Sequence, residues 1–248
     1  MHSKLTPSSW IYLLVHALVF FVGVSLLSID HTIAVAVATS MMATGLAGWV
    51  VFFWVRQQEV SARSLQNLAK LGIVDGFHYR SVPIRDQYEP RFQKARREIS
   101  IMGFGLRALR EDFGPQFKSW AGSAKVRILL IDPNAPGSGC SYANQRDIEE
   151  ENHTGSIRSD VEAMLRYTEE LRREQPENFQ IRLYTCIPSI NVCVIDDEAF
   201  WGPFLSKRQS RNTMTLLCRR GGHMYAALAE HFEAVWSDPA LSHPPREA

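Results

Sequence analysis

Residues 10–27 read WIYLLVHALVFFVGVSLL, and residues 32–55 read TIAVAVATSMMATGLAGWVVFFWV. Neither stretch contains Asp, Glu, Lys or Arg. A helix that crosses the hydrocarbon core of a bilayer needs about 20 mostly apolar residues, so both stretches are long enough. Because only residues 28–31 separate them, we expect a tight hairpin of two transmembrane helices, with every backbone group paired inside its own helix.

Two other interpretations of these stretches stay open. The first stretch could be a cleaved signal peptide ahead of a single anchor, although Lys4 gives only a thin basic region and no small-residue cleavage site precedes the second stretch. The two stretches could also form a buried hairpin in a soluble domain. Aromatic residues near the ends favour the membrane, because such residues form belts at the interface; they are Trp10, Tyr12, Trp49, Phe52, Phe53 and Trp54.

Basic residues predict the orientation of the hairpin. Lys4 precedes the first stretch, and Arg56, Arg63 and Lys70 follow the second, whereas residues 28–31 contain no Lys or Arg. Because short cytoplasmic segments carry an excess of Lys and Arg, we expect both termini to lie in the cytoplasm.

Four residues inside the stretches indicate how the helices associate. Ser40, Thr44 and Gly48 recur every four residues, a spacing of small side chains that lets helix backbones approach closely in lipid. His16 is the only ionisable residue deep in either stretch, and such residues are candidates for function. We expect a neutral His16 imidazole hydrogen-bonded to the neighbouring helix, with a proton or pore role as the alternative.

Composition over the whole chain hides this asymmetry. The 248 residues are 46% hydrophobic and 21% charged, with a formal net charge of +1. These values exclude a disordered or fibrous chain and argue against a general nucleic-acid binder, which would show a basic excess. We predict a coupling helix at 56–73, a compact cytoplasmic domain at 74–238 and a disordered tail at 239–248.

Apolar runs alternate with helical patterns in the domain, which indicates an α/β fold with helices packed on a sheet. We predict strands at 99–103, 126–131, 181–184, 191–195 and 214–218, and helices at 90–98, 104–118, 147–173 and 224–235. The four cysteines lack CxxC spacing, so we expect free thiols and neither a metal nor a cofactor; they are Cys140, Cys186, Cys193 and Cys218.

Four segments together resemble a phospholipase D-like domain. KVRILLIDPN (125–134) is similar to its second strand, and EISIMGFGLRAL (98–109) to a strand that runs into a helix. IRLYTCIPSINVCVIDDEAFWGPF (181–204) resembles the signature strand and the loop after it, and HFEAVWSD (231–238) resembles a C-terminal helix of the family. The resemblance covers residues 95–238 and implies an α/β sandwich.

The resemblance also implies that the chemistry is lost. Active members carry His-x-Lys-x-x-x-x-Asp, in which His attacks phosphorus and Lys neutralises the developing charge. Ser189 and Asn191 occupy the His and Lys positions, and only Asp196 matches. Serine lacks an activating base in the motif and asparagine carries no charge, so we expect no catalytic residues.

Bacterial cardiolipin synthases place two spans before two such halves, whereas this chain has room for one. A single half of this family pairs with a second to complete its cleft, so the resemblance implies a homo-oligomer, dimer or larger, in the bacterial inner membrane. We expect the cleft to be kept for binding a phosphate-bearing ligand, through Gly103, Gly105, Arg107, Ser189, Asn191 and Arg211. A tight turn explains Gly103-Phe104-Gly105 equally well, and a solvated surface explains the basic run 207–212.

The first functional hypothesis is a non-enzymatic membrane effector, because the layout resembles the two-span effectors of bacterial anti-phage systems. Its partners would be the lipid bilayer, further copies of the chain, and a sensor protein complex or a nucleotide. The second hypothesis is a membrane-bound phosphodiesterase or phosphatidyltransferase, whose nucleophile would be another histidine: His78, His153, His223 or His231. The third is a passive anchor or scaffold.

Overall fold

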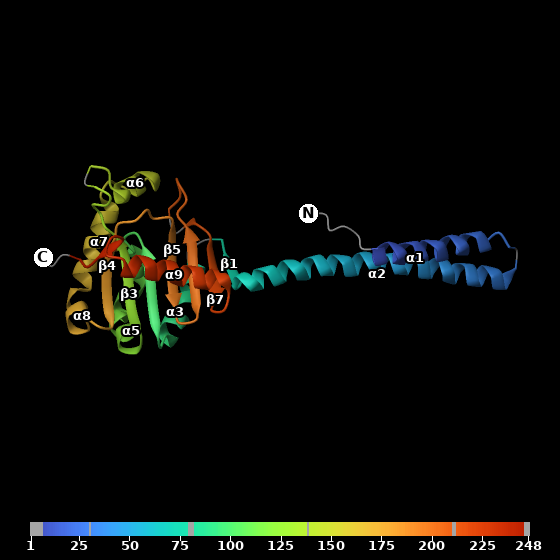
Figure 1. Ribbon diagram of the computed structural model, residues 1–248, viewed down its shortest axis with the longest axis horizontal. Coiled ribbons are helices and arrows are strands. Elements are labelled where there is room, and N and C mark those ends of the chain that lie inside the picture. The colour runs from blue at the N-terminus through green and yellow to red at the C-terminus, as the bar shows by residue number, and fades with distance from the viewer. Residues whose placement is uncertain (1–6, 30, 79–81, 138, 210–211, 246–248) are drawn as a thin grey trace. The chain divides into compact units, whose positions relative to one another are not determined.

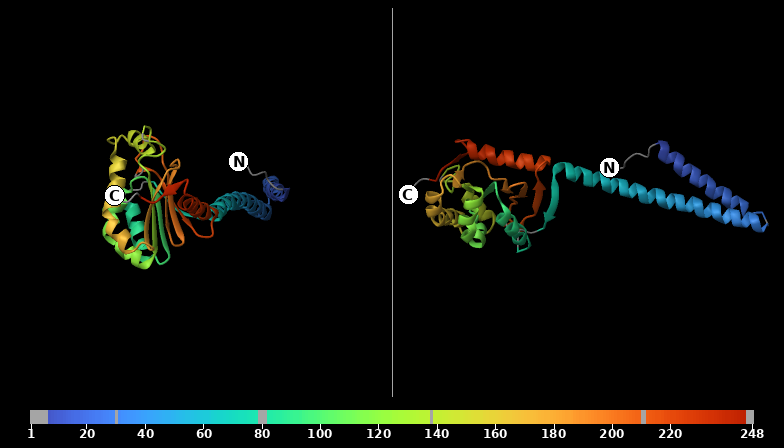
Figure 2. Two further views of the ribbon diagram at one scale, coloured as in Figure 1. Left: turned by 60° about the vertical axis from the view of Figure 1, so that its left-hand side comes forward. Right: turned by 90° about the horizontal axis from the view of Figure 1, so that it is seen from below.

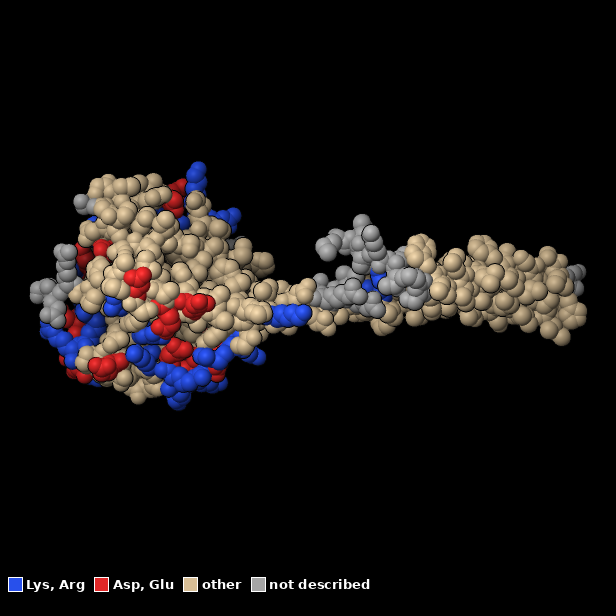
Figure 3. Space-filling model, viewed as in Figure 1, with Lys and Arg blue, Asp and Glu red and all other residues tan. Residues whose placement is uncertain are grey.

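The computed structural model of the chain describes residues 7–29, 31–78, 82–137, 139–209 and 212–245. The chain divides into two compact units, Met1–Asn67 and Leu68–Ala248. The first unit holds an apolar helical hairpin, and the second holds an α/β domain (Figure 1). Charged side chains are concentrated on the α/β domain (Figure 3).

The hairpin consists of α1 (Pro7–Leu26) and α2 (Thr32–Leu71). The segments Ser9–Leu26 and Thr32–Gln58 are long and apolar enough to cross a membrane. Only 6% of the first segment and 17% of the second are buried in the protein. This exposure contradicts the interpretation as a buried soluble hairpin, because a core helix is mostly buried; insertion into a membrane stays a prediction.

Glycine, rather than hydroxyl side chains, lets α1 and α2 approach closely. A Cβ atom at Gly48 would lie 1.7 Å from Cδ2 of His16, so the ring occupies the space that glycine leaves. His16 Nδ1 lies 2.9 Å from the Tyr12 carbonyl oxygen, which corrects the expected bond to the neighbouring helix: it stays within α1. Ser40 and Thr44 are exposed, and Thr44 Oγ1 donates to the Ser40 carbonyl at 2.8 Å, so of the three small residues only Gly48 packs in the hairpin.

The α/β domain contains one eight-stranded sheet and a set of mostly short helices. The strands are β1 (Ile73–Phe77), β2 (Glu98–Gly103), β3 (Lys125–Ile131), β4 (Phe179–Tyr184), β5 (Ile190–Ile195), β6 (Glu198–Pro203), β7 (Thr215–Arg219) and β8 (Ser242–His243). The helices are α3 (Val82–Lys94), α4 (Arg107–Phe113), the 3₁₀ turn η1 (Gly114–Gln116), α5 (Phe117–Ser123), α6 (Tyr142–Glu149), α7 (Ser156–Tyr167), α8 (Glu169–Glu174) and α9 (His223–Ser237).

The sheet has the strand order β1-β7-β6-β5-β2-β3-β4-β8. Strands β2, β3 and β4 run parallel, and all other neighbours pair antiparallel. Helix α9 covers one face of the sheet, and α3, α5, α7 and α8 lie on the other, whereas α6 lies beyond one end of the strands (Figures 1 and 2). Because β3 is covered on both faces, its sequence KVRILLI is buried at every position after Lys125. Among these buried residues Arg127 alone is charged, and its guanidinium binds Glu98, Ser100 and Glu233.

The five predicted strands all form, but several helices differ from the prediction. The helix expected at 147–173 is instead the end of α6, then α7 and α8. The chain turns at Gly155, where φ is +88°, and the buried Asp147 carboxylate accepts hydrogen bonds from Gly155 N and Ile157 N. The expected helix 104–118 begins only at Arg107 and is interrupted by η1. The helix expected at 90–98 is α3, which begins and ends earlier.

The ends of the domain also differ from the prediction. Residues 242–243 were expected in a disordered tail but form β8, which pairs with the end of β4. Ser242 is buried, its Oγ donates to the Val235 carbonyl at 2.6 Å, and Arg182 donates to it in turn. The residues after the fourth predicted strand form β6, because the turn at Asp196 and Asp197 closes a hairpin with β5.

The coupling helix predicted to reach residue 73 ends at Leu71, since Ile73 already belongs to β1. Gly72 between them has φ +78°, and its carbonyl accepts a hydrogen bond from Arg219 N at 2.9 Å. A Cβ atom at Gly222, the first residue before α9, would lie only 2.2 Å from the Gly72 Cα. The end of α2 therefore meets the start of α9 backbone against backbone.

Candidate functional site

The carboxyl edge of the parallel strands collects most of the predicted ligand-binding residues. Gly103 ends β2, and Gly105 follows it. Strand β5 runs antiparallel to β2, with Met102 paired to Val192, so its first residues lie beside Gly103. Ser189 and Asn191 therefore lie at the same edge of the sheet as Gly103, and ligand binding there stays a prediction. Arg211 lies outside the described residues.

At the two positions that the sequence comparison set against the His and Lys of the motif, one side chain is hydrogen-bonded and the other is exposed. Asn191 is only 1% exposed, and its Nδ2 donates to the Gly202 carbonyl at 2.8 Å, which ties β5 to β6. The Ser189 side chain is exposed, and its carbonyl accepts a hydrogen bond from Phe204 N at 3.0 Å. A neutral amide inside the sheet and a surface hydroxyl do not reproduce a nucleophile beside a cation.

Asp196, the one matching residue of the motif, lies at the other end of β5. Its carboxylate accepts hydrogen bonds from the backbone N–H groups of Arg96, Arg97 and Glu98, at 3.0, 2.9 and 3.0 Å. Burial raises the pKa of the Asp196 carboxyl, but these N–H groups outweigh burial and hold the pKa below its ordinary value. The backbone of Asp196 is left-handed, with φ +48°. The geometry gives Asp196 a structural role: it anchors the β5–β6 turn to the start of β2.

The turn after β2 lies against a carboxylate of α7, that of Asp160. A Cβ atom at Gly105 would lie 2.5 Å from Cβ of Asp160, so glycine is required by the close approach of α7. Burial raises the pKa of Asp160, while the nearby Arg107 and Arg110 oppose the shift. Arg107 is exposed and its Nε lies 2.8 Å from Oε1 of Glu111. The turn is thus explained by packing and by internal charges.

Arg146 is a functional candidate that the sequence did not single out. It comes from α6, its side chain is 3% exposed, and its guanidinium carbon lies 5.7 Å from the ring centre of Phe104 and 5.4 Å from that of Phe204. The two rings lie 4.6 Å apart. Arg146 also binds the carboxylates of Glu149 and Glu150 and donates to the carbonyls of the loop after β6. This cluster packs against the edge beside Ser189.

A carboxylate–histidine pair lies farther along the same edge. His243 Nε2 lies 3.1 Å from Oδ2 of Asp132, which follows β3, and Nδ1 lies 2.8 Å from the Pro244 carbonyl oxygen. The pair joins residues 111 positions apart, so no local pattern predicts it. The four histidines proposed as nucleophiles lie elsewhere: His78, His153 and His223 are exposed and His231 is half-buried in α9.

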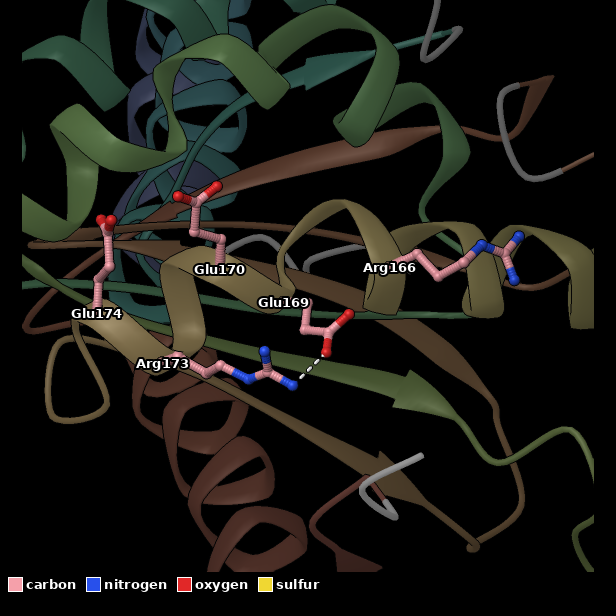
Figure 4. A pocket seen from close by; sticks show the side chains of 5 residues that line it. All are labelled: Arg166, Glu169, Glu170, Arg173 and Glu174. Atoms are coloured by element: carbon pink, nitrogen blue, oxygen red, sulfur yellow. Dashed lines mark hydrogen bonds and ion pairs between the residues drawn. The ribbon is translucent and has the colours of Figure 1, made fainter.

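The surface of α7 and α8 carries a shallow pocket of mixed charge. Figure 4 shows its side chains, in which Arg173 reaches Glu169 within one helix. The lining residues are Arg166, Glu169, Glu170, Arg173 and Glu174. Because acids and bases alternate on an exposed helical surface, the pocket has no charge preference that would select a ligand.

No protein-family model matches the chain, and a comparison with curated proteins gave no match. Among solved structures, TrmBL2, an archaeal chromatin protein, is 13% identical with a TM-score of 0.42, over 80% of this chain and 67% of that one. NucT from Helicobacter pylori is 15% identical with a TM-score of 0.39, over 64% and 92%. The phosphatidylserine synthase of Haemophilus influenzae Rd KW20 is 10% identical with a TM-score of 0.43, over 74% and 43%. The last two are phospholipase D superfamily members.

Proposed function

We propose that the chain is a membrane-anchored, non-catalytic effector of bacterial anti-phage defence. Its phospholipase D-like domain senses a ligand or a partner, and its hairpins then associate with those of further copies and disrupt the membrane. The continuity of α2 carries the proposal. This helix runs from the apolar segment to Leu71, and only Gly72 separates it from the sheet.

The site supports binding rather than catalysis. The motif positions hold an exposed serine and a buried asparagine whose amide is hydrogen-bonded within the sheet. Beside them, two aromatic rings pack against the guanidinium of Arg146. A hairpin of two helices encloses no aqueous path by itself, so disruption of a bilayer requires several copies. The comparison with two-span defence effectors rests on layout, which is an analogy between architectures.

Expression of the full chain in a bacterial host, with and without phage challenge, tests the proposal. We expect loss of membrane potential and arrest of growth, and leakage of dye from liposomes that carry the purified protein with its trigger. The matched control is the domain without residues 1–55, which is expected to leave the potential unchanged. An unchanged potential under every challenge would overturn the proposal and favour a passive anchor.

One observation favours the enzymatic alternative. The imidazole of His243 is paired with a carboxylate at the carboxyl edge of the sheet, an arrangement that orients histidines in catalysis. Hydrolysis of bis(p-nitrophenyl) phosphate by the full chain, lost in His243→Ala, would establish a phosphodiesterase and contradict the non-catalytic proposal. We expect no hydrolysis, because both ring nitrogens already contact protein oxygens.

A further inference from the structure

A groove between α3 and α5 lies at the end of the sheet opposite Ser189 and Asn191. Its volume is about 390 Å³, within the range of small-ligand sites. It opens beside the starts of β2 and β3, where α3 ends and α5 ends. Its lining residues are Phe92, Gln93, Arg96, Gln116, Ser119, Trp120 and Ser123.

The polar groups of the groove suit an anion. Gln93, Gln116 and Ser119 are neutral and can donate hydrogen bonds, whereas Ser123 Oγ already donates to the Trp120 carbonyl at 3.2 Å. None of the lining residues is acidic, and Arg96 supplies a positive charge. Buried Phe92 and Trp120 stack at the base, with ring centres 4.1 Å apart. The Trp120 Nε1 donor is buried there without a hydrogen-bond partner in the described structure. A site rich in donors and free of carboxylates favours phosphate over a cation.

Arg96 differs from its neighbours in the partners of its guanidinium. Arg97 binds Asp197, and Arg91 binds Glu198. Arg96 Nη1 instead donates to the carbonyls of Gln93 and Ala95, at 3.5 and 2.9 Å, and the described contacts pair it with no carboxylate. A guanidinium with several free donors is a preferred phosphate-binding group in proteins, and that of Arg96 is exposed.

We infer that the groove binds the phosphoryl group of a small phosphate ester, and that this binding is relayed to the end of α2. The inference rests on the proposed sensing function and moves the ligand from the motif edge to the α3–α5 groove. The shared chemistry is a phosphate monoester, whether on a nucleotide or on a lipid headgroup.

The relay follows a chain of hydrogen bonds and ion pairs within the α/β domain. Arg96 N donates to Asp196, and the adjacent Asp197 binds both Arg97 and Arg220. Arg220 N also donates to the Asp197 carbonyl at 2.7 Å. The residue before it, Arg219, donates its N–H to the carbonyl of Gly72, directly after α2. A shift of the Arg96 backbone on binding would therefore displace the Asp196–Asp197 turn first and then the backbone at Gly72, directly after α2.

Calorimetric titration of the full chain in detergent micelles tests the site. The probes are inorganic phosphate, a nucleoside 5′-monophosphate and glycerol 3-phosphate, of which the second and third distinguish a nucleotide from a lipid headgroup. We expect at least one ester to bind more tightly than inorganic phosphate. Arg96→Gln is expected to weaken that binding about tenfold or more, because a charge-assisted hydrogen bond is lost.

Two further variants keep the test independent of folding. Ser119→Leu fills the groove from an exposed position and is expected to abolish binding, whereas Lys94→Gln, an exposed α3 cation that does not line the groove, is expected to bind as the unchanged chain does. No binding of any probe, or equal affinity of the unchanged chain and Arg96→Gln, would overturn the site.

Leakage of dye from liposomes with the same ester separates this inference from the proposed function. Binding without leakage would leave the site standing and count against the effector. Leakage that persists in Arg96→Gln and Ser119→Leu would leave the effector standing and overturn the groove as its sensor.

Discussion

Gly222→Ala tests the backbone contact between the end of α2 and the start of α9. A Cβ atom there would lie 2.2 Å from Gly72 Cα, 2.5 Å from Gly72 N and 2.6 Å from the Leu71 carbonyl oxygen. All three are backbone atoms, so no side-chain rotation relieves the overlap and the two segments must separate. Overpacking of this kind costs about 1–3 kcal/mol. For a unit the size of Leu68–Ala248, each kcal/mol lowers the melting temperature by about 2–4 °C, so we expect a fall of roughly 2–12 °C.

Differential scanning calorimetry of the full chain in micelles measures this change, and Gly122→Ala is the matched control. Gly122 lies inside α5 with no atom within 4 Å of the added methyl group, and alanine is about 1 kcal/mol more favourable than glycine in a helix. The control is therefore expected to melt at the same temperature or slightly higher. A Gly222→Ala chain that melts like the unchanged protein would refute the close contact.

Two further predictions address the hairpin and the anchored turn. Gly48→Leu is expected to separate α1 from α2, because the side chain would enter the space of the His16 ring, whereas Thr44→Leu on the exposed face is expected to leave the hairpin intact. The yield of disulfide crosslinks between cysteine pairs introduced on the two helices measures this difference. An equal loss of crosslinking in both variants would contradict the packing. The lowered pKa of Asp196 means that its carboxylate stabilises the fold above the ordinary carboxyl pKa and that this contribution is lost as the pH falls through the lowered value. Between about pH 5 and pH 3, the free energy of urea unfolding should therefore fall less for Asp196→Asn than for the unchanged chain. An equal fall in both chains would count against Asp196 as an anchor of the turn.

The strands were predictable because they are buried on both faces. The apolar run of β3 needs only its own sequence to be recognised, and the same holds for β2 and β5. Strand β6 was missed because Gly202 and Pro203 are typical of a loop, yet β6 is held by β5 on one side and β7 on the other. The break at Gly155 had a local signal, a glycine after polar residues, that the charged pattern of the helix obscured.

The candidate sites depend on contacts between distant residues. The resemblance assigned Ser189, Asn191 and Gly103 to one cleft, but the sequence could not reveal that Asn191 is buried and donates to the Gly202 carbonyl. The enclosure of Arg146 by two aromatic rings and the pairing of His243 with Asp132 join segments far apart in the chain. Such groups become visible only when the sheet edge is assembled.

The attachment of α2 to an edge strand decides how the domain would yield to mechanical load. Strand β1 has a partner on one side only, β7, and the chain enters it at Ile73, opposite Cys218. A pull delivered through α2 therefore acts on the first rung of the β1–β7 ladder rather than on all rungs together. The β1–β7 pairing would then be lost first at Ile73 and afterwards toward Phe77. The edge strand β1 would thus separate from β7 before the other strands of the sheet separate from one another.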